Sequence, residues 1–316
     1  MKIAFTICST NYLPFAKALG DTFMQHNSDY AFSIVLIDTL PSGEVSFFEP
    51  HPIIEITKLG LPEFDEMNNK YNIFELSCAL KPYVIEYFIR HNPSAEVIAY
   101  FDSDILVYNK LTLCEYALKK HPVTLTPHIN ISLDEDGHFP NEEILLKAGL
   151  FNAGFIAVNN SKEAKEFIGW WKKKLLTKCF NDTQKGLFVD QLWLSFVPVF
   201  FPSSCILNNP GYNVAYWNFQ ERDLSFSNTF TINNDHPLVF FHFSGYDINT
   251  PEIISKYQDR FSFENKPEFR PLFDEYRSRI IENLYHNFKD IKPAFGFIKE
   301  EIQPVKKNFF QKIFNK

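Results

Sequence analysis

An alternation of short apolar runs with amphipathic segments constrains the fold of this chain more than any other feature. Residues 2–8 and 32–37 are apolar runs that predict buried strands, and residues 53–56 form a shorter third run. Between the first two runs lie a polar turn at 9–11 and a helical pattern that continues to about residue 25. Strands separated by helices in this way predict a parallel sheet with helices on its faces.

The middle of the chain continues the pattern. Residues 72–90 have helical apolar spacing, and Pro82 is expected to kink this helix or divide it in two. The run VIAYF at 97–101 predicts a strand. A further strand is expected at 155–158, entered through a turn of small residues at 152–154.

The second half adds two helices and a last core strand. Ser161 is a suitable N-cap for a helix that reaches about residue 176. Residues 185–196 look helical, and 238–243 predict a strand. Beyond about residue 250 the composition changes to mixed helices and then to a tail rich in Lys and Phe at 292–316.

Charge and cysteine usage limit the partners and the compartment. A net charge of -7 over 316 residues argues against a general nucleic-acid binder, because such proteins need a basic field to displace counterions. Five scattered cysteines without C-x-x-C spacing predict free thiols in a reducing compartment. With no apolar stretch of about 18 residues, we expect a cytoplasmic protein.

The strongest candidate for chemistry is Asp102-Ser103-Asp104, directly after the strand at 97–101. In open α/β sheets, ligands bind outside the carboxyl ends of the strands. Two carboxylates this close favour a cation between them, and hard oxygen ligands suit Mg²⁺ or Mn²⁺ held jointly with phosphates. A solvated turn that happens to carry two acidic residues would give the same pattern.

A second candidate is His242, in FFHFSGY at the end of the last strand. A lone histidine among phenylalanines is either a metal ligand or a core residue with one hydrogen bond. Gly245, three residues later, indicates that the backbone comes close to another group there.

Two polar segments and one lysine could line a pocket. Asn152-Ala153-Gly154 fits either a polar pocket wall or a simple turn. Asp190-Gln191 lies among apolar residues, and a buried carboxylate needs a partner or a ligand. For Asp190 a structural salt bridge is the alternative. Lys81 stands in an apolar segment, where it contacts a phosphate or is simply exposed.

Other enzyme classes lack their sequence signatures. The chain has no G-x-x-x-x-G-K-[ST] loop, no G-x-G-x-x-G turn and no G-x-S-x-G elbow. These absences argue against a P-loop enzyme, a dinucleotide-binding enzyme and an α/β-hydrolase.

Taken in order, the motifs resemble glycosyltransferase family 8 and its relatives with the GT-A fold. Stretches such as CALKPYVIEYF, LFVDQLW and NPGYNVAYWNF also look like a bacterial group of uncharacterised glycosyltransferases. The resemblance covers about four-fifths of the chain. It implies a transferase domain at 1–250, with a mixed, mostly parallel Rossmann-like sheet, and a helical C-terminal extension at 251–316. The matching elements are Asn11-Tyr12, Lys81, Asp102-Ser103-Asp104, FNAGFIAVN at 151–159, Asp190-Gln191 and His242 to Gly245.

The resemblance also implies roles for residues. Asp102, Asp104 and His242 would ligate Mn²⁺ or Mg²⁺, which would bridge the diphosphate of a nucleotide-sugar, a UDP-sugar above all. The resemblance further implies hexose transfer with retention to a glycan or lipid-linked acceptor in bacterial surface polysaccharide synthesis. The remaining donor contacts would come from Thr6, Asn11, Tyr12, Lys81, Ser103, Asn152, Ala153, Gly154 and Gly245.

Retention leaves two mechanisms open. A double displacement needs a carboxylate close to the anomeric carbon, and Asp190 is the candidate. Gln191 would instead support a front-face attack.

The chain departs from the family at two places. Family members often carry an acidic residue near the uracil, where this chain has Ser9-Thr10. The lysine-proline-tryptophan that usually follows the H-x-x-G element is replaced by Tyr246-Asp247. The phosphate contact of that lysine must therefore be replaced or lost.

Three alternatives complete the expectations. The tail at 292–316 alternates cations with Phe and Ile, which fits peripheral contact with the cytoplasmic face of a membrane as well as a frayed terminal helix. A haloacid-dehalogenase-like phosphohydrolase also uses Asp-x-Asp after a strand, usually near the N-terminus. A non-catalytic sugar-binding relative is the third alternative.

Overall fold

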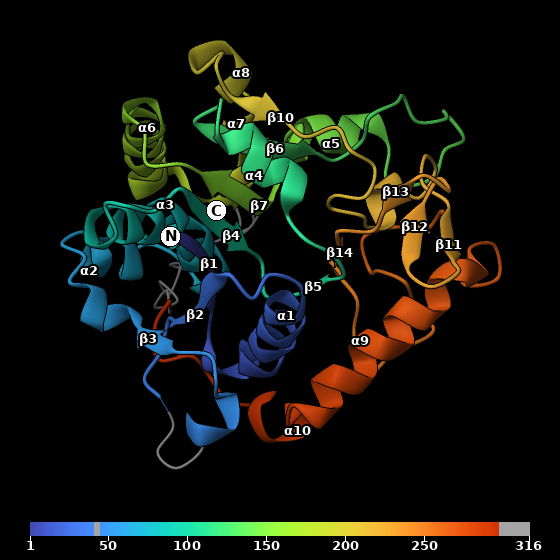
Figure 1. Cartoon of the computed structure of the whole chain (residues 1–316), viewed down its shortest axis with the longest axis horizontal. Helices are drawn as coiled ribbons and strands as arrows, with labels where there is room; N and C mark the ends of the chain where they lie inside the picture. Colours follow the sequence, from blue (N-terminus) through green and yellow to red (C-terminus); the bar gives the residue numbers. More distant parts are fainter. Residues whose placement is uncertain (41–44, 297–316) are drawn as a thin grey trace, which may run out of the picture.

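A seven-stranded sheet forms the centre of the computed structural model, which describes residues 1–40 and 45–296 (Figure 1). The strand order is β10-β6-β7-β4-β1-β2-β3. Neighbouring strands run parallel except at β7, which is antiparallel to both β4 and β6. This mixed, mostly parallel sheet confirms the predicted fold class. Its strands are β1 (Lys2–Cys8), β2 (Tyr30–Leu36), β3 (Ile53–Glu55), β4 (Val97–Phe101), β6 (Val123–Pro127), β7 (Phe151–Val158) and β10 (Cys205–Ile206).

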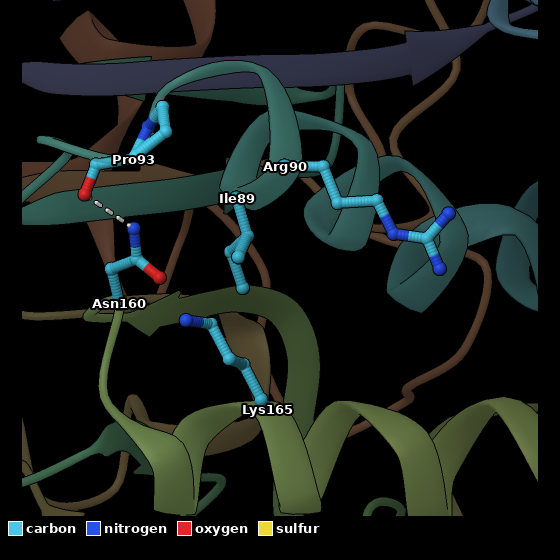
Figure 2. Close-up of a pocket in the computed structure, with 5 residues that line it drawn as sticks. All are labelled: Ile89, Arg90, Pro93, Asn160 and Lys165. Atoms are coloured by element: carbon cyan, nitrogen blue, oxygen red, sulfur yellow. Dashed lines mark hydrogen bonds between the residues drawn. The ribbon is translucent and has the colours of Figure 1, made fainter.

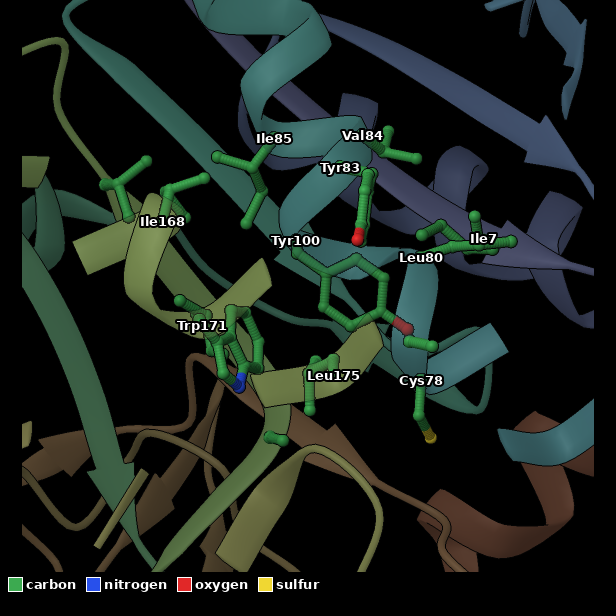
Figure 3. Packing of buried hydrophobic residues seen from close by; sticks show 14 of the residues in the cluster. Ile7, Cys78, Leu80, Tyr83, Val84, Ile85, Tyr100, Ile168, Trp171 and Leu175 are labelled. Atoms are coloured by element: carbon green, nitrogen blue, oxygen red, sulfur yellow. The ribbon is translucent and has the colours of Figure 1, made fainter. Parts of the chain in front are cut away.

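Helices cover both faces of the sheet because successive strand residues point to opposite sides. Ile3, Phe5 and Ile7 of β1 pack with α3 and α6, whereas Ala4 and Cys8 pack with α1 and α4. Figure 3 shows the first of these cores. The longer helices are α1 (Leu13–His26), α3 (Ile73–His91), α4 (Thr112–Leu118), α5 (Glu142–Ala148), α6 (Lys162–Lys178) and α9 (Arg270–Glu282).

A third core lies beside the sheet. The strands β5 and β14 pair antiparallel, and α9 packs against them and against α1. Phe243 and Tyr276 stack with ring centroids 3.9 Å apart. The remaining elements are α2 (Phe64–Asn68), β5 (Ile105–Val107), β8 (Asn181–Asp182), β9 (Leu187–Phe188), α7 (Gln191–Leu194), α8 (Val197–Phe200), β11 (Leu224–Phe226), β12 (Phe230–Ile232), β13 (His236–Pro237), β14 (Phe240–His242) and α10 (Tyr285–Phe288).

The helix α3 corrects the expected effect of Pro82, because it runs unbroken through that residue. It starts with a capping box in which the Asn72 side chain accepts from the Glu75 amide and the Glu75 carboxylate accepts from the Asn72 amide. Most of its residues are buried between the sheet and α6. Tertiary packing on this scale outweighs the hydrogen bond that one proline removes.

Two further segments differ from expectation. Residues 185–196 are not one helix, because Gly186 and Val189 have φ of +68° and +37° and the chain forms only β9 and the short α7. Residues 152–154 are not a turn but part of β7, where the ladder with β6 shifts register between Leu125 and Thr126. By contrast, Ser161 caps α6 as predicted, with its side chain accepting from the Ala164 amide.

The expected domain boundary at residue 250 stays a prediction, and most of the tail at 292–316 lies outside the described residues. Within the described ranges, no helix combines the length and apolarity needed to cross a bilayer.

Close packing of α1 gives a first testable prediction. A Cβ at Gly20 would lie 2.8 Å from both His51 Nε2 and Phe32 Cε1. Gly20→Ala should therefore lower the free energy of unfolding by about 1–2 kcal/mol, because the clash outweighs the better helix propensity of alanine. Urea unfolding curves would measure this change.

The matched control is Gly169→Ala in α6, where a Cβ would have nothing within 4 Å. This variant should be stabilised by roughly 0.5–1 kcal/mol through helix propensity alone. Equal effects of the two variants would contradict the packing argument.

Candidate active site

The three predicted metal ligands lie together at one edge of the central sheet. Asp102 and Asp104 occupy the turn between β4 and β5, and β14 pairs with β5 so that His242 lies opposite Ile105. The His242 Nε2 atom is 3.0 Å from Asp104 Oδ1 and 3.9 Å from Asp102 Oδ2. One ligand atom from each of the three side chains falls within 4.8 Å of the others.

The donor set fits a divalent metal. Two carboxylates and one imidazole nitrogen suit Mn²⁺, and the carboxylates suit Mg²⁺. Both carboxylates are partly exposed, so a ligand can reach them, whereas His242 is buried. The His242 Nδ1 atom has no hydrogen-bond partner among the described residues.

Without a metal, Asp104 and His242 form an ion pair. Burial opposes charge on both groups, but the charge of His242 and its hydrogen bond leave the pKa of Asp104 below its ordinary value. Burial would likewise lower the pKa of His242, and Asp104 raises it above its ordinary value. A metal would take the place of the proton between these groups.

Gly154 lets the histidine ring take this position. A Cβ on Gly154 would lie 2.4 Å from His242 Cε1 and 2.7 Å from Asn152 Oδ1. The Gly154 carbonyl also accepts from the Asp102 amide at 2.8 Å, which extends the contact between β7 and β4 to the metal turn. The backbone of Gly154 therefore approaches the His242 ring closely, which is the kind of contact that the sequence indicated for Gly245.

Lys81 is buried below the acidic turn rather than exposed. Its ammonium nitrogen lies 2.9 Å from Asp190 Oδ2 and 3.3 Å from Asp102 Oδ1, and it donates to the Ala153 carbonyl at 3.0 Å. It also lies 4.7 Å from the centroid of the Tyr100 ring, whose hydroxyl donates to Asp102.

The charges around Lys81 compensate its burial. Desolvation would lower the pKa of Lys81, but Asp102 and Asp190 raise it well above the ordinary value. Burial raises the pKa of Asp190, and Lys81 opposes this change. The salt bridge that the sequence left open for Asp190 is present.

Asp190 and Gln191 are both engaged with the protein. The Asp190 carbonyl accepts from Trp171 Nε1 at 3.2 Å. The Gln191 Oε1 atom accepts from Asn152 Nδ2 and from the Ala153 amide, and its Nε2 donates to the Ala148 carbonyl. The start of α7 is thus fastened to the start of β7.

The N-terminal candidates lie in β1 and directly after it, and the carboxyl end of β1 lies beside that of β4. Thr6 is buried, and its hydroxyl has no partner among the described residues. Asn11 accepts from the Ser9 hydroxyl at 2.6 Å. Tyr12 is largely exposed, and Ser103 is partly exposed between the two carboxylates.

Three buried residues near the site had no role in the sequence interpretation. Asn213, in the left-handed region with φ of +53°, donates to Thr126 Oγ1 and to Asn152 Oδ1. Trp217 packs edge-on against His242 and against His128, with centroids 5.2 and 5.3 Å apart. Burial lowers the pKa of His128 to about 4, so its ring is neutral at pH 7. The only sequence feature that pointed to Asn213 and Trp217 was the polar-aromatic stretch NPGYNVAYWNF, which contains both.

Gly245 has φ of +75°, and a Cβ there would lie 2.5 Å from both Ser255 Oγ and Tyr257 Cδ2. Its carbonyl accepts from the Lys256 amide at 3.0 Å. Residues 246–255 therefore form a loop that returns the chain to Gly245 and places Lys256 beside it.

A separate hollow at the end of α3 contains none of these residues. Figure 2 shows its lining, including the hydrogen bond from Asn160 Nδ2 to the Pro93 carbonyl at 2.8 Å. We assign it no function. Its lining residues are Ile89, Arg90, Pro93, Asn160 and Lys165.

The sequence matches no family model. Two proteins of Bacillus subtilis (strain 168), both described as uncharacterized, are similar to it. YfnF is 25% identical over 236 residues, which cover 72% of this chain and 74% of YfnF. YfnD is 22% identical over 312 residues, which cover 95% of each chain.

Similar solved structures are glycosyltransferases. The galactosyltransferase LgtC, in complex with donor and acceptor sugar analogues, has a TM-score of 0.53 at 16% identity and covers 88% of this chain and 95% of its own. The bifunctional glycosyltransferase WbbM, in its apo form, has a TM-score of 0.52 at 15% identity. That match covers 89% of this chain and 51% of WbbM, so this chain spans about half of WbbM. These similarities show a shared GT-A-like fold.

The contact between Gly154 and His242 gives a second prediction. Gly154→Ala should weaken Mn²⁺ binding by roughly 10–100-fold, because the added methyl displaces the histidine ring. A titration followed by the electron paramagnetic resonance of free Mn²⁺ would measure it. Gly169→Ala, which touches nothing, should bind as the wild type does. Unchanged affinity in a folded Gly154→Ala protein would contradict the prediction that Gly154 sets the position of His242 for metal binding.

Proposed function

We propose that this chain is a metal-dependent glycosyltransferase that moves a hexose from a nucleotide-sugar, with UDP as the nucleotide, to a glycan or lipid-linked acceptor. The observation that carries the proposal is the cluster of Asp102, Asp104 and His242 at the carboxyl end of β4, in a fold shared with glycosyltransferases. We further propose that the reaction retains the anomeric configuration and serves bacterial surface polysaccharide synthesis.

In the proposed metal site, each of the three ligands has a distinct place. Asp102 and Asp104 would each give a carboxylate oxygen, and His242 would give Nε2 from the opposite side. A bound Mn²⁺ or Mg²⁺ would supply positive charge next to the diphosphate that leaves the sugar. Tyr100 and Lys81 hold the Asp102 carboxylate in place before any ligand arrives.

Lys256 is our candidate for the missing phosphate contact. The lysine expected soon after Gly245 is absent from the sequence at that point, and Lys81 is occupied by two carboxylates. The Lys256 amide donates to the carbonyl of Gly245, and Gly245 lies three residues after the proposed metal ligand His242. A lysine at this place can add a charge-assisted hydrogen bond to a diphosphate.

On the donor-sugar side we propose Asn152, Ala153, Asp190 and Gln191. Gln191 accepts hydrogen bonds from Asn152 and Ala153, and Lys81 joins Asp190 to the Ala153 carbonyl. Asp190 is buried and paired with Lys81, so nucleophilic attack would require its carboxylate to leave that pair. Gln191 would support a front-face attack without a change of partners. Both mechanisms remain consistent with the proposal, and the shared fold favours the transferase over the phosphohydrolase alternative.

The function is tested with a panel of nucleotide-sugars, incubated with Mn²⁺ or with EDTA, by measuring the released nucleotide. We expect release from one donor in Mn²⁺ and none in EDTA. Asp104→Asn should lower the turnover at least about a hundredfold, because one charged ligand is lost. Asp235→Asn, at an exposed carboxylate on a loop, should be unaffected. Donor binding without release, even with acceptors supplied, would support a non-catalytic sugar-binding protein instead.

A separate prediction concerns Lys256. Lys256→Ala should weaken UDP binding about tenfold, because a hydrogen bond between charged groups is removed. Isothermal titration with UDP and Mn²⁺ would measure this. Lys162→Ala, at an exposed lysine on α6, serves as the control. Equal affinities of the Lys256→Ala protein and the wild type would contradict the assignment.

A further inference from the structure

An exposed apolar ridge runs along residues 193–200, from the end of α7 through α8 and shortly after Asp190 and Gln191. Phe196, Val199 and Phe200 are 47%, 73% and 51% exposed. The rings of Phe196 and Phe200 stack at 5.3 Å, and Trp170 of α6 packs edge-on against Phe200 at 5.8 Å. In Figure 1, α8 lies at the upper margin of the molecule beside β10 and α6. We call Trp170, Trp193, Phe196, Val199 and Phe200 the apolar ridge.

The ridge continues toward α5. Leu146 and Leu150 are 65% and 47% exposed, and the Leu150 amide donates to Ser195 Oγ at 3.1 Å, directly before Phe196. Single exposed apolar residues are ordinary, but a contiguous group of this kind marks an interaction surface.

The flank of the ridge is cationic at the C-terminal end of α6, although the whole chain carries a net charge of -7 and the exposed Glu166 lies four residues before Trp170. The Lys174 ammonium lies 5.3 Å from the centroid of the Trp193 ring, and Trp193 Nε1 donates to the Lys178 carbonyl at 3.2 Å. Lys173 and Lys178 are exposed on α6. Glu163, at the other end of α6, accepts from Ser203 Oγ.

We propose that the apolar ridge docks onto an anionic lipid surface. Aromatic rings and valine can enter the boundary between headgroups and acyl chains, while flanking lysines attract anionic headgroups. A second copy of the chain is the other occupant considered, and the self-association measurement below tests it.

The position of the ridge gives docking a consequence for the site. Asp190 directly precedes α7 and Gln191 is its first residue, and the chain continues from α7 into α8. A docked ridge would hold the site next to the membrane surface, where a lipid-linked acceptor is found. This consequence rests on the proposed function, whereas the docking itself does not.

Docking is tested by co-sedimentation of the full chain with vesicles of phosphatidylcholine alone or with added phosphatidylglycerol. We expect the wild type to bind the anionic vesicles. The double variant Val199→Glu and Phe200→Ser should bind at least about tenfold more weakly, since two apolar side chains that would enter the lipid are lost. Lys173→Glu with Lys178→Glu should also weaken binding, most clearly at low salt.

Three controls separate docking from other causes. Phe226→Ser, at a 66% exposed ring on β11, and Lys110→Glu should bind as the wild type does. A full chain with Phe309, Phe310 and Phe314 changed to Ser tests the tail. Unchanged thermal unfolding and unchanged donor hydrolysis in solution would show that the ridge variant is folded with an intact site.

The proposal is overturned by any of three results. The first is that the wild type binds no vesicles, and the second is that the ridge variant binds them as well as the wild type. The third result is that the ridge variant differs only in self-association, measured by sedimentation equilibrium, which would make the ridge an interface between copies. If neither the wild type nor any variant hydrolyses a donor, but the wild type still docks, the proposed function is contradicted and the docking proposal is supported.

Discussion

A buried ammonium group holds together the parts of the site that come from distant segments. Lys81 reaches from α3 to Asp102 after β4, to Asp190 before α7 and to the Ala153 carbonyl in β7. Removing one partner from such a buried group leaves uncompensated charge, which is strongly destabilising. The proposed metal turn and the proposed sugar-binding segment therefore cannot shift independently of each other.

The sequence predicted those features that depend on strand order and on strand ends. Asp102 and Asp104 follow a buried run, and His242 ends another, so both groups were expected at an edge of the sheet. The continuity of α3 through Pro82 could not be predicted, because it depends on packing between the sheet and α6. The break before Asp190 was missed for a similar reason, since nothing in the sequence marks the backbone conformation of Val189.

Residues whose partners lie far away along the chain were also beyond sequence reasoning. In the sequence, Lys81 cannot be distinguished from an exposed lysine on a helix with apolar neighbours. Its two carboxylate partners, Asp102 and Asp190, are 21 and 109 residues away along the chain. His128 belongs to none of the motifs, and the stretch NPGYNVAYWNF that contains Asn213 does not indicate which residues Asn213 contacts. Their common feature is contact with Asn152, which only the folded chain provides.

The loop from Gly245 to Lys256 has a consequence for how relatives of this chain are recognised. The Lys256 amide donates to the Gly245 carbonyl, and Ile254 and Ser255 directly before it are buried, so the fold places Lys256 beside Gly245 although ten residues separate them. A pattern that counts residues from the glycine would classify this chain as lacking the lysine altogether. If Lys256 has the phosphate-binding role proposed above, an alignment of relatives has to match this lysine by its place beside Gly245 and not by its distance along the sequence from that glycine.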